Sequence, residues 1–185
     1  GRTWTGNSLV YRSPDGSVCE CCAPVMACTS TGQFLILFRN ALAGKRDMWL
    51  ARGGPEGFTP AEKLGKGSWN LAGCPMAAGA LAPAPKDLLT FWQREDRLFR
   101  CLPGRKEEEL GAGMQLTAAA GAAGAWSAWI GAGADAPLLL LRPGARVPET
   151  VAQNAQWPVL AAGPGGTGPL ALAWEDHAGA RVVLR

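Results

Sequence analysis

Histidine, tyrosine and clustered positive charge are scarce in this sequence, and each scarcity excludes a class of function. The chain of 185 residues has one histidine and one tyrosine, so neither a mixed Cys/His zinc site nor a Ser-His-Asp triad is expected. No run of Lys and Arg exceeds two residues and the net charge is +3, so nucleic acid is not expected as a partner. The longest uncharged apolar stretches, Pro75–Pro85 and Ala118–Trp126, are too short for a membrane span.

Glycine and proline are abundant by contrast, with 25 and 14 residues, which indicates many short elements joined by turns. Four segments follow one order: a short apolar strand, a turn with Gly or Pro, a strand ending in an aromatic and polar residues, and a further strand. Pro24, Pro75 and Pro158 mark the first strand of three copies, where a missing N–H is tolerated. The turns after the first strands are Ser30–Gly32, Pro83–Lys86 and Gly163–Gly168. The expected strands are Ala23–Ala27, Phe34–Asn40, Arg46–Arg52 and Lys63–Gly67; Cys74–Ala78, Leu88–Glu95, Arg97–Leu102 and Glu109–Gly113; Leu116–Ala119, Gly124–Trp129 and Pro137–Arg142; Trp157–Ala162, Pro169–Asp176 and Ala180–Arg185.

This repeat predicts an all-β fold, a β-propeller-like array of about four four-stranded blades in a single domain. The blade-like repeats span about residues 19–70, 71–116, 117–156 and 157–185 plus 1–12. We expect the ring to be closed by Asn7–Arg12 pairing beside Arg181–Arg185, or else to be part of a larger ring that a second copy or a missing segment completes. A β-sandwich made of the same strands is the alternative.

Short motifs also carry a family resemblance. Gly1–Trp4 looks like the tail of an Asp-box, the Ser-x-Asp-x-Gly-x-Thr-Trp turn of sialidase blades. Further matching segments are Val18–Cys22, Phe38–Asn40, Arg46–Met48, Phe58–Pro60, Lys63–Gly65 and Gly73–Met76. Together they resemble bacterial secreted sialidase-like proteins with Asp-box (BNR) repeats. The resemblance implies a six-bladed propeller, of which this chain would be the C-terminal half to two-thirds, and exo-α-sialidase-like glycoside hydrolase activity in the complete form.

The chain departs from that family at two places. Arg52–Phe58 stands where an Asp-box is expected and has neither its Ser nor its Asp. The family uses a Tyr nucleophile, and the single tyrosine, Tyr11, is expected on an outer strand, away from the central channel. Enzymatic activity is therefore left open.

Polar residues recur where the second strand of three of the repeats ends, which predicts that they share one rim of the ring. A glycosidase needs two carboxylates across the scissile bond, and the candidate catalytic residues are Asp47, Glu175 and Asp176. Arginines could hold an anionic sugar by bidentate hydrogen bonds, and the candidate substrate-binding residues are Arg39, Asn40, Arg46, Trp92, Arg94 and Glu95. The alternative is that these charges are solvated rim pairs. The aromatic residues Phe38, Trp92, Trp129 and Trp174 recur at one repeat position, which favours packing between blades.

Six cysteines are enough for three disulfides in an oxidising compartment, so a secreted or periplasmic protein is expected. They are Cys19, Cys21, Cys22, Cys28, Cys74 and Cys101. A bridge from the Cys19–Cys22 segment to Cys74 is favoured, because Cys22 and Cys74 adjoin the first strands of adjacent repeats. The alternatives are redox chemistry or a soft-metal site, for copper(I), on Cys19, Cys21 and Cys22. A second close cysteine pair for a four-cysteine zinc site is not found in the sequence.

These observations favour a secreted, sialidase-like propeller that recognises carbohydrate or another small anionic ligand and needs no cofactor. A non-catalytic scaffold for protein interactions and a copper-binding protein are the alternatives. The chain begins at Gly1 without a signal peptide, so we expect a processed chain or a fragment.

Overall fold

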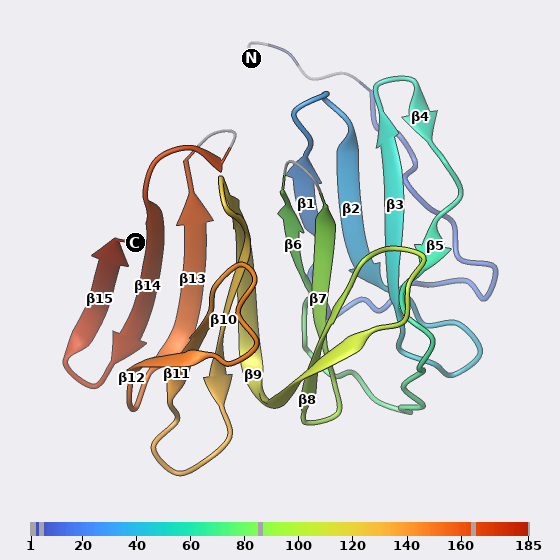
Figure 1. The fold of residues 1–185 in the computed structure, drawn as a ribbon. Coiled ribbons are helices and arrows are strands. Elements are labelled where there is room, and N and C mark those ends of the chain that lie inside the picture. The colour runs from blue at the N-terminus through green and yellow to red at the C-terminus, as the bar shows by residue number, and fades with distance from the viewer. Residues whose placement is uncertain (1–2, 4–5, 85–86, 164–165, 185) are drawn as a thin grey trace.

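The protein is built from antiparallel β-strands, and a computed structural model describes residues 3, 6–84, 87–163 and 166–184. Within these residues the strands form three sheets and no α-helix, so the all-β prediction is confirmed (Figure 1). The first sheet contains β1 (Val25–Cys28), β2 (Phe34–Arg39), β3 (Met48–Gly54), β4 (Gly57–Phe58) and β5 (Glu62–Lys63). The second contains β6 (Ala80–Pro83), β7 (Leu88–Arg94), β8 (Arg97–Cys101), β9 (Glu108–Gly121), β10 (Gly124–Gly131), β11 (Leu138–Leu141) and β12 (Glu149–Ala152). The third contains β13 (Gln156–Ala162), β14 (Leu170–Asp176) and β15 (Gly179–Leu184).

The long strand β9 divides the second sheet into two units. Its first residues pair with β8, as in Arg97 with Ala112, and the stretch from Gly113 to Gly121 pairs with β10. Gly111, near the end of the part that pairs with β8, has a φ of 127°, a conformation that glycine adopts without strain. The chain therefore forms four successive antiparallel units: β1–β5, β6 to the start of β9, the rest of β9 to β12, and β13–β15.

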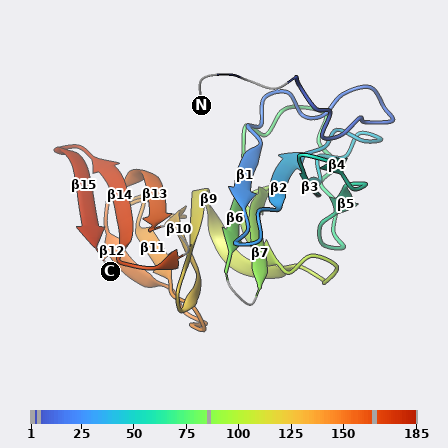
Figure 2. The same ribbon diagram turned by 90° about the horizontal axis from the view of Figure 1, so that it is seen from above.

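The first strands of the four units lie next to one another. β1 lies beside β6, β6 beside β9, and β9 beside β13, so that the first and third sheets stand at opposite ends of the molecule (Figures 1 and 2). The later strands of each unit extend outward from this inner row. As a result, the turns that follow β1, β6, β9 and β13 lie together on one face of the molecule.

Neighbouring units bury their apolar faces against each other. Leu37 and Leu50 of the first sheet share a core with Trp92 and Phe99 of the second, and a separate core joins β9–β11 to the third sheet. Burial of each such side chain contributes about 1.5–3 kcal/mol. Phe38, Trp92 and Trp129 are buried and Trp174 packs against the second core, so all four aromatic residues take part in packing, and their packing between blades stays a prediction.

Most strands lie where the repeat predicts them, but the first strand of the second unit does not. The prediction of a strand at Cys74–Ala78 is wrong, because β6 begins at Ala80. Cys74 is bonded to Cys21, and the carbonyl of Ala77 accepts hydrogen bonds from the Arg39 side chain. The hydrogen bonds from Arg39 occupy the Ala77 carbonyl that strand pairing would need, and the disulfide fixes the position of Cys74.

The predicted closure by Asn7–Arg12 is also wrong, because these residues form no strand beside β15. Tyr11 instead packs on the first sheet, with ring-centroid distances of 4.9 Å to Phe38 and 6.0 Å to Trp49. Its hydroxyl accepts a 2.8 Å hydrogen bond from Asn40. The segment that was expected to complete the last unit thus covers the first one. The Asp-box tail at Gly1–Trp4 lies outside the described residues except for Thr3.

A buried carboxylate joins the first two units and gives a pH-dependent prediction. Glu107 accepts hydrogen bonds from the backbone N–H groups of Lys66 (2.6 Å) and Gly67 (2.8 Å) and from Arg94 (2.8 Å). Burial alone would raise the pKa of Glu107, but these hydrogen bonds outweigh it and lower the pKa to about 2. Glu107→Gln should therefore reduce the free energy of unfolding at pH 7 by about 1–3 kcal/mol.

Because the folded pKa lies below the ordinary value of 4.5, this stabilisation is present above about pH 4.5 and is lost as the pH falls towards 2. Urea unfolding of the wild type and of Glu107→Gln should show a smaller difference in the free energy of unfolding at pH 3 than at pH 7. Glu109→Gln, at an exposed ion pair with Arg97, is the matched control and should change stability by less than about 0.5 kcal/mol. An equal loss at both pH values would contradict the assigned role of the Glu107 charge.

Candidate functional site

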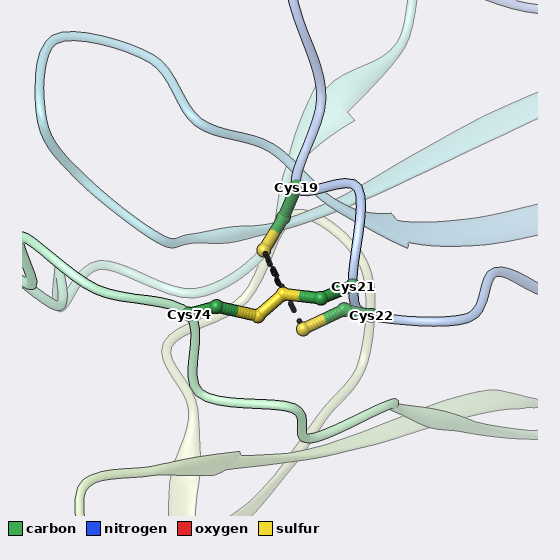
Figure 3. Close-up of side chains that lie close together, drawn as sticks. All are labelled: Cys19, Cys21, Cys22 and Cys74. Atoms are coloured by element: carbon green, nitrogen blue, oxygen red, sulfur yellow. Dashed lines mark hydrogen bonds between the residues drawn. A yellow bond between two sulfur atoms is a disulfide. The ribbon is translucent and has the colours of Figure 1, made fainter.

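Four cysteines, Cys19, Cys21, Cys22 and Cys74, lie close together near the end of β2. Cys21 and Cys74 form a disulfide, which confirms the predicted bridge between the Cys19–Cys22 segment and Cys74 (Figure 3). Cys19 and Cys22 are buried thiols beside it, with their sulfurs 3.5 Å apart. Cys28 and Cys101 are also free, so one disulfide is observed where the cysteine count allowed three.

Backbone contacts hold this cluster in place. The N–H of Cys19 donates a 2.9 Å hydrogen bond to the carbonyl of Arg39 at the end of β2, and the N–H of Cys22 donates a hydrogen bond to the carbonyl of Cys19. Burial raises the pKa of the Cys19 thiol, Cys22 raises it further, and Arg46 acts in the opposite direction. Burial likewise raises the pKa of Cys101. Both thiols are therefore held in the protonated form at neutral pH.

Arg39, predicted to bind substrate, is buried between the first two units. Its guanidinium donates to the carbonyls of Arg46 (2.6 Å), Ala77 (3.1 Å) and Gln93 (2.9 Å). Burial lowers the pKa of this guanidinium, while Cys22, Cys19 and Asp47 act against the lowering. The side chain is 2% exposed, so its hydrogen-bonding groups face the protein.

The structure brings several other predicted rim residues close to Arg39. The residues around one small cavity include Arg46, Asp47, Trp92 and Arg94. The cavity volume is about 10 Å³, about enough for a single water molecule and too small for a sugar. Asp47 accepts hydrogen bonds from the Ser68 hydroxyl and the Trp69 N–H, so its carboxylate fixes the loop that follows β5.

The remaining rim residues lie in other places. Asn40 is buried and donates to Tyr11, and Glu95 lies exposed in the turn between β7 and β8. Glu175 and Asp176 lie at the end of β14 in the third sheet, whereas Asp47 lies directly before β3 in the first sheet. Asp176 accepts hydrogen bonds from Arg181 and the Ala178 N–H, the first of which lowers its pKa most.

A larger groove lies at the opposite ends of the strands. Its volume is about 780 Å³, within the range of small-molecule sites. Its wall includes Cys28, Pro83, Ala119 and Ala162, which belong to the ends of β1, β6, β9 and β13. The first strands of the four units, β1, β6, β9 and β13, thus contribute to one concave surface.

The polar groups of the groove come from the turns after first strands and from the second half of β3. Thr29, Ser30 and Thr31 of the β1–β2 turn line it together with Arg52 and Asp87. Arg52 donates from Nε and Nη2 to Glu62, which orients its guanidinium. Reasoning from sequence missed this groove, although its signal was present: the turns after the predicted first strands occupy equivalent places in the repeats.

No protein-family model and no curated protein matches this sequence. Among solved structures, the chain is similar to the crystal structure of an α-L-arabinofuranosidase from Lactobacillus brevis, with a TM-score of 0.45 and 10% identity. That alignment covers 88% of this chain and 71% of the other chain. A similarity at this level transfers no function. Within the described residues, no helix has the length and apolar character required to cross a membrane.

Proposed function

We propose that the four units are blades of a sialidase-like propeller, in one domain, and that the groove at the ends of their first strands binds a carbohydrate. The observation that carries the proposal is the convergence of four successive first strands on one groove of about 780 Å³. Blades arranged side by side place their innermost strands next to one another in this way. The disulfide supports a secreted or periplasmic location, since such bonds persist in oxidising compartments.

The chemistry of the groove favours an acidic sugar. Hydroxyl groups of Thr29, Ser30 and Thr31 can exchange hydrogen bonds with sugar hydroxyls, and Asp87 adds an exposed carboxylate acceptor. The Arg52 guanidinium can donate to a sugar carboxylate, a charge-assisted bond that is stronger than a neutral one. The proposed ligand class is therefore a sugar that carries a carboxylate.

Binding, and not hydrolysis, is the activity we propose for this chain. Most glycoside hydrolases use two carboxyl groups on either side of the scissile bond, and sialidases use a Tyr nucleophile in place of one of them. The single tyrosine of the chain, Tyr11, packs on Phe38 and Trp49 of the first sheet and does not line the groove. The candidates are divided between Asp47, which holds Ser68 and Trp69, and the pair Glu175 and Asp176 in the third sheet. Among the described residues that line the groove, one carboxylate is present, that of Asp87.

The test is calorimetric titration with N-acetylneuraminic acid as the acidic probe and galactose as the neutral one. Wild-type protein should bind the acidic sugar more tightly, and Arg52→Ala should weaken that binding about tenfold or more, because it removes a charged hydrogen bond worth about 1.5–3 kcal/mol. Asp87→Asn should reduce binding of both sugars, since a carboxylate acceptor becomes a neutral amide.

Two variants outside the groove are the matched controls for this test. Arg97→Ala removes an exposed arginine and Glu175→Gln changes a rim carboxylate, and both should bind as the wild type does. Thermal unfolding followed by circular dichroism checks that all four variants are folded. Loss of binding in Glu175→Gln with retention in Arg52→Ala would place the site at the rim and overturn the proposal. Absence of binding to either sugar at millimolar concentration would also overturn it.

A scaffold role is a second candidate, because the last strand presents an apolar edge. β15 pairs with β14 within the described residues, and Val182 and Leu184 on it are 67% and 64% exposed. Such an edge favours pairing with another strand, from a second copy or a further segment. Light scattering after size-exclusion chromatography should then show a dimer that Val182→Lys converts to monomer, and a monomeric wild type would contradict pairing between copies.

A further inference from the structure

The cysteine cluster has a geometry that a single structural disulfide does not require. The Sγ atoms of Cys19, Cys21, Cys22 and Cys74 all lie within 4.8 Å of one another (Figure 3). The Cys19 sulfur lies 3.7 Å from that of Cys21 and 3.5 Å from that of Cys22. In a tetrahedral zinc site with Zn–S bonds of about 2.3 Å, sulfurs are separated by about 3.8 Å. The two separations around Cys19 are thus close to those of a tetrathiolate site.

We propose that, once the Cys21–Cys74 disulfide is reduced, Cys19, Cys21, Cys22 and Cys74 bind one zinc ion. The sequence offers one close pair of the usual spacing, Cys19 and Cys22. The fold supplies what the sequence alone does not show, because it places Cys74, from the loop before β6, against the same three sulfurs. The fourth ligand therefore comes from the neighbouring unit.

The surroundings of the cluster suit an anionic metal centre. Four thiolates around Zn²⁺ carry a net charge of about −2. Two guanidinium groups lie near them: Arg39 interacts with Cys22, and Arg46 interacts with Cys19. Arg39 is 2% exposed and donates its hydrogen bonds to backbone carbonyls, so an adjacent anion would compensate a buried positive charge. Arg46 also donates to the carbonyl of Gly73, next to Cys74.

The burial pattern allows a switch between two states. Cys19 and Cys22 are buried, whereas Cys21 and Cys74, which form the disulfide, are exposed. A dithiol reductant can therefore reach the bond. It gives two electrons and two protons to the disulfide, producing two thiols, and is itself oxidised to a disulfide. Zinc then replaces the four thiol protons, which are released to solvent. In the oxidised state two of the four sulfurs are unavailable as thiolates, and zinc should bind weakly.

The experiment compares the oxidised protein with protein reduced by dithiothreitol and freed of reductant under argon. Native mass spectrometry after addition of Zn²⁺ should show one zinc per reduced chain, with at least about tenfold weaker binding to the oxidised chain. Substitution with Co²⁺ should give the intense visible absorption of a tetrahedral thiolate site. Zinc should protect the exposed cluster cysteines, Cys21 and Cys74, from iodoacetamide in the reduced protein and leave Cys28, which is exposed and outside the cluster, reactive.

Ligand and control variants complete the design. Cys74→Ser should reduce zinc affinity by more than about 100-fold, since loss of an outer-shell partner alone costs about 10–100-fold. Cys28→Ser should leave affinity unchanged. If Cys74→Ser fails to fold, the pattern of alkylation in reduced wild-type protein still decides the matter. Alkylation of Cys21 and Cys74 as fast as that of Cys28 in the presence of zinc, equal binding by the oxidised chain, or binding of copper(I) with none of Zn²⁺ or Co²⁺ would overturn the proposal.

Discussion

Replacing Arg39 with methionine should reduce the free energy of unfolding by about 3–5 kcal/mol. The side chain is 2% exposed and ties β2 to two segments of the second unit through the carbonyls of Ala77 and Gln93. Methionine fills a similar length but leaves these carbonyls and that of Arg46 without their donor. Buried acceptors that lose a partner each cost about 1–3 kcal/mol.

Urea unfolding monitored by tryptophan fluorescence measures this effect. Arg39→Lys should recover a small part of the loss, because an ammonium group cannot reproduce the planar arrangement of guanidinium donors. Arg97→Ala removes an arginine whose side chain is 49% exposed and should change stability by less than about 0.5 kcal/mol. A change as small in Arg39→Met would show that Arg39 does not join the two units, and a substrate-binding role would then be open again.

The second large effect is expected at Trp129, where Trp129→Ala should cost about 3–5 kcal/mol. Trp129 is 1% exposed and packs with Leu98 of β8 and Leu141 of β11. It therefore connects the two halves of the second sheet. Removal of its side chain would leave a cavity, because β8 and β11 cannot both move to fill the space.

Thermal and urea unfolding of Trp129→Ala should show one cooperative transition at lower stability. Trp157→Ala is the matched control, because Trp157 is 61% exposed, and it should cost less than about 1 kcal/mol. Similar losses in the two variants would contradict the packing described for the second sheet. The same result would weaken the division of that sheet into two units.

The strands could be predicted because their signals are local. Alternating or continuous apolar stretches between Gly and Pro turns mark β7, β10, β13 and β14 within a few residues of their observed limits. β6 and the N-terminal segment were misplaced for a different reason. Their conformations depend on contacts with residues distant in the sequence: those of Cys74 and Ala77, and those of Tyr11 with the first sheet. The local sequence pattern does not predict such contacts.

The candidate site divides in the same way. The bridge to Cys74 followed from the order of the repeats, because adjacent units bring equivalent positions together. The burial of Arg39 did not, since an arginine at a strand end is usually solvated. The groove was missed because its wall is made of small residues and turns, such as Ala119 and Ser30, whose role depends on where four separate strands end.

The most direct test of ligand binding in the groove uses Cys28, an exposed thiol in its wall. The rate of alkylation of Cys28 by iodoacetamide is measured by mass spectrometry with and without saturating N-acetylneuraminic acid. Bound sugar should slow the reaction several-fold in wild-type protein, and the same sugar concentration should give little protection in Arg52→Ala. An unchanged rate at a concentration that calorimetry shows to be saturating would contradict binding in the groove.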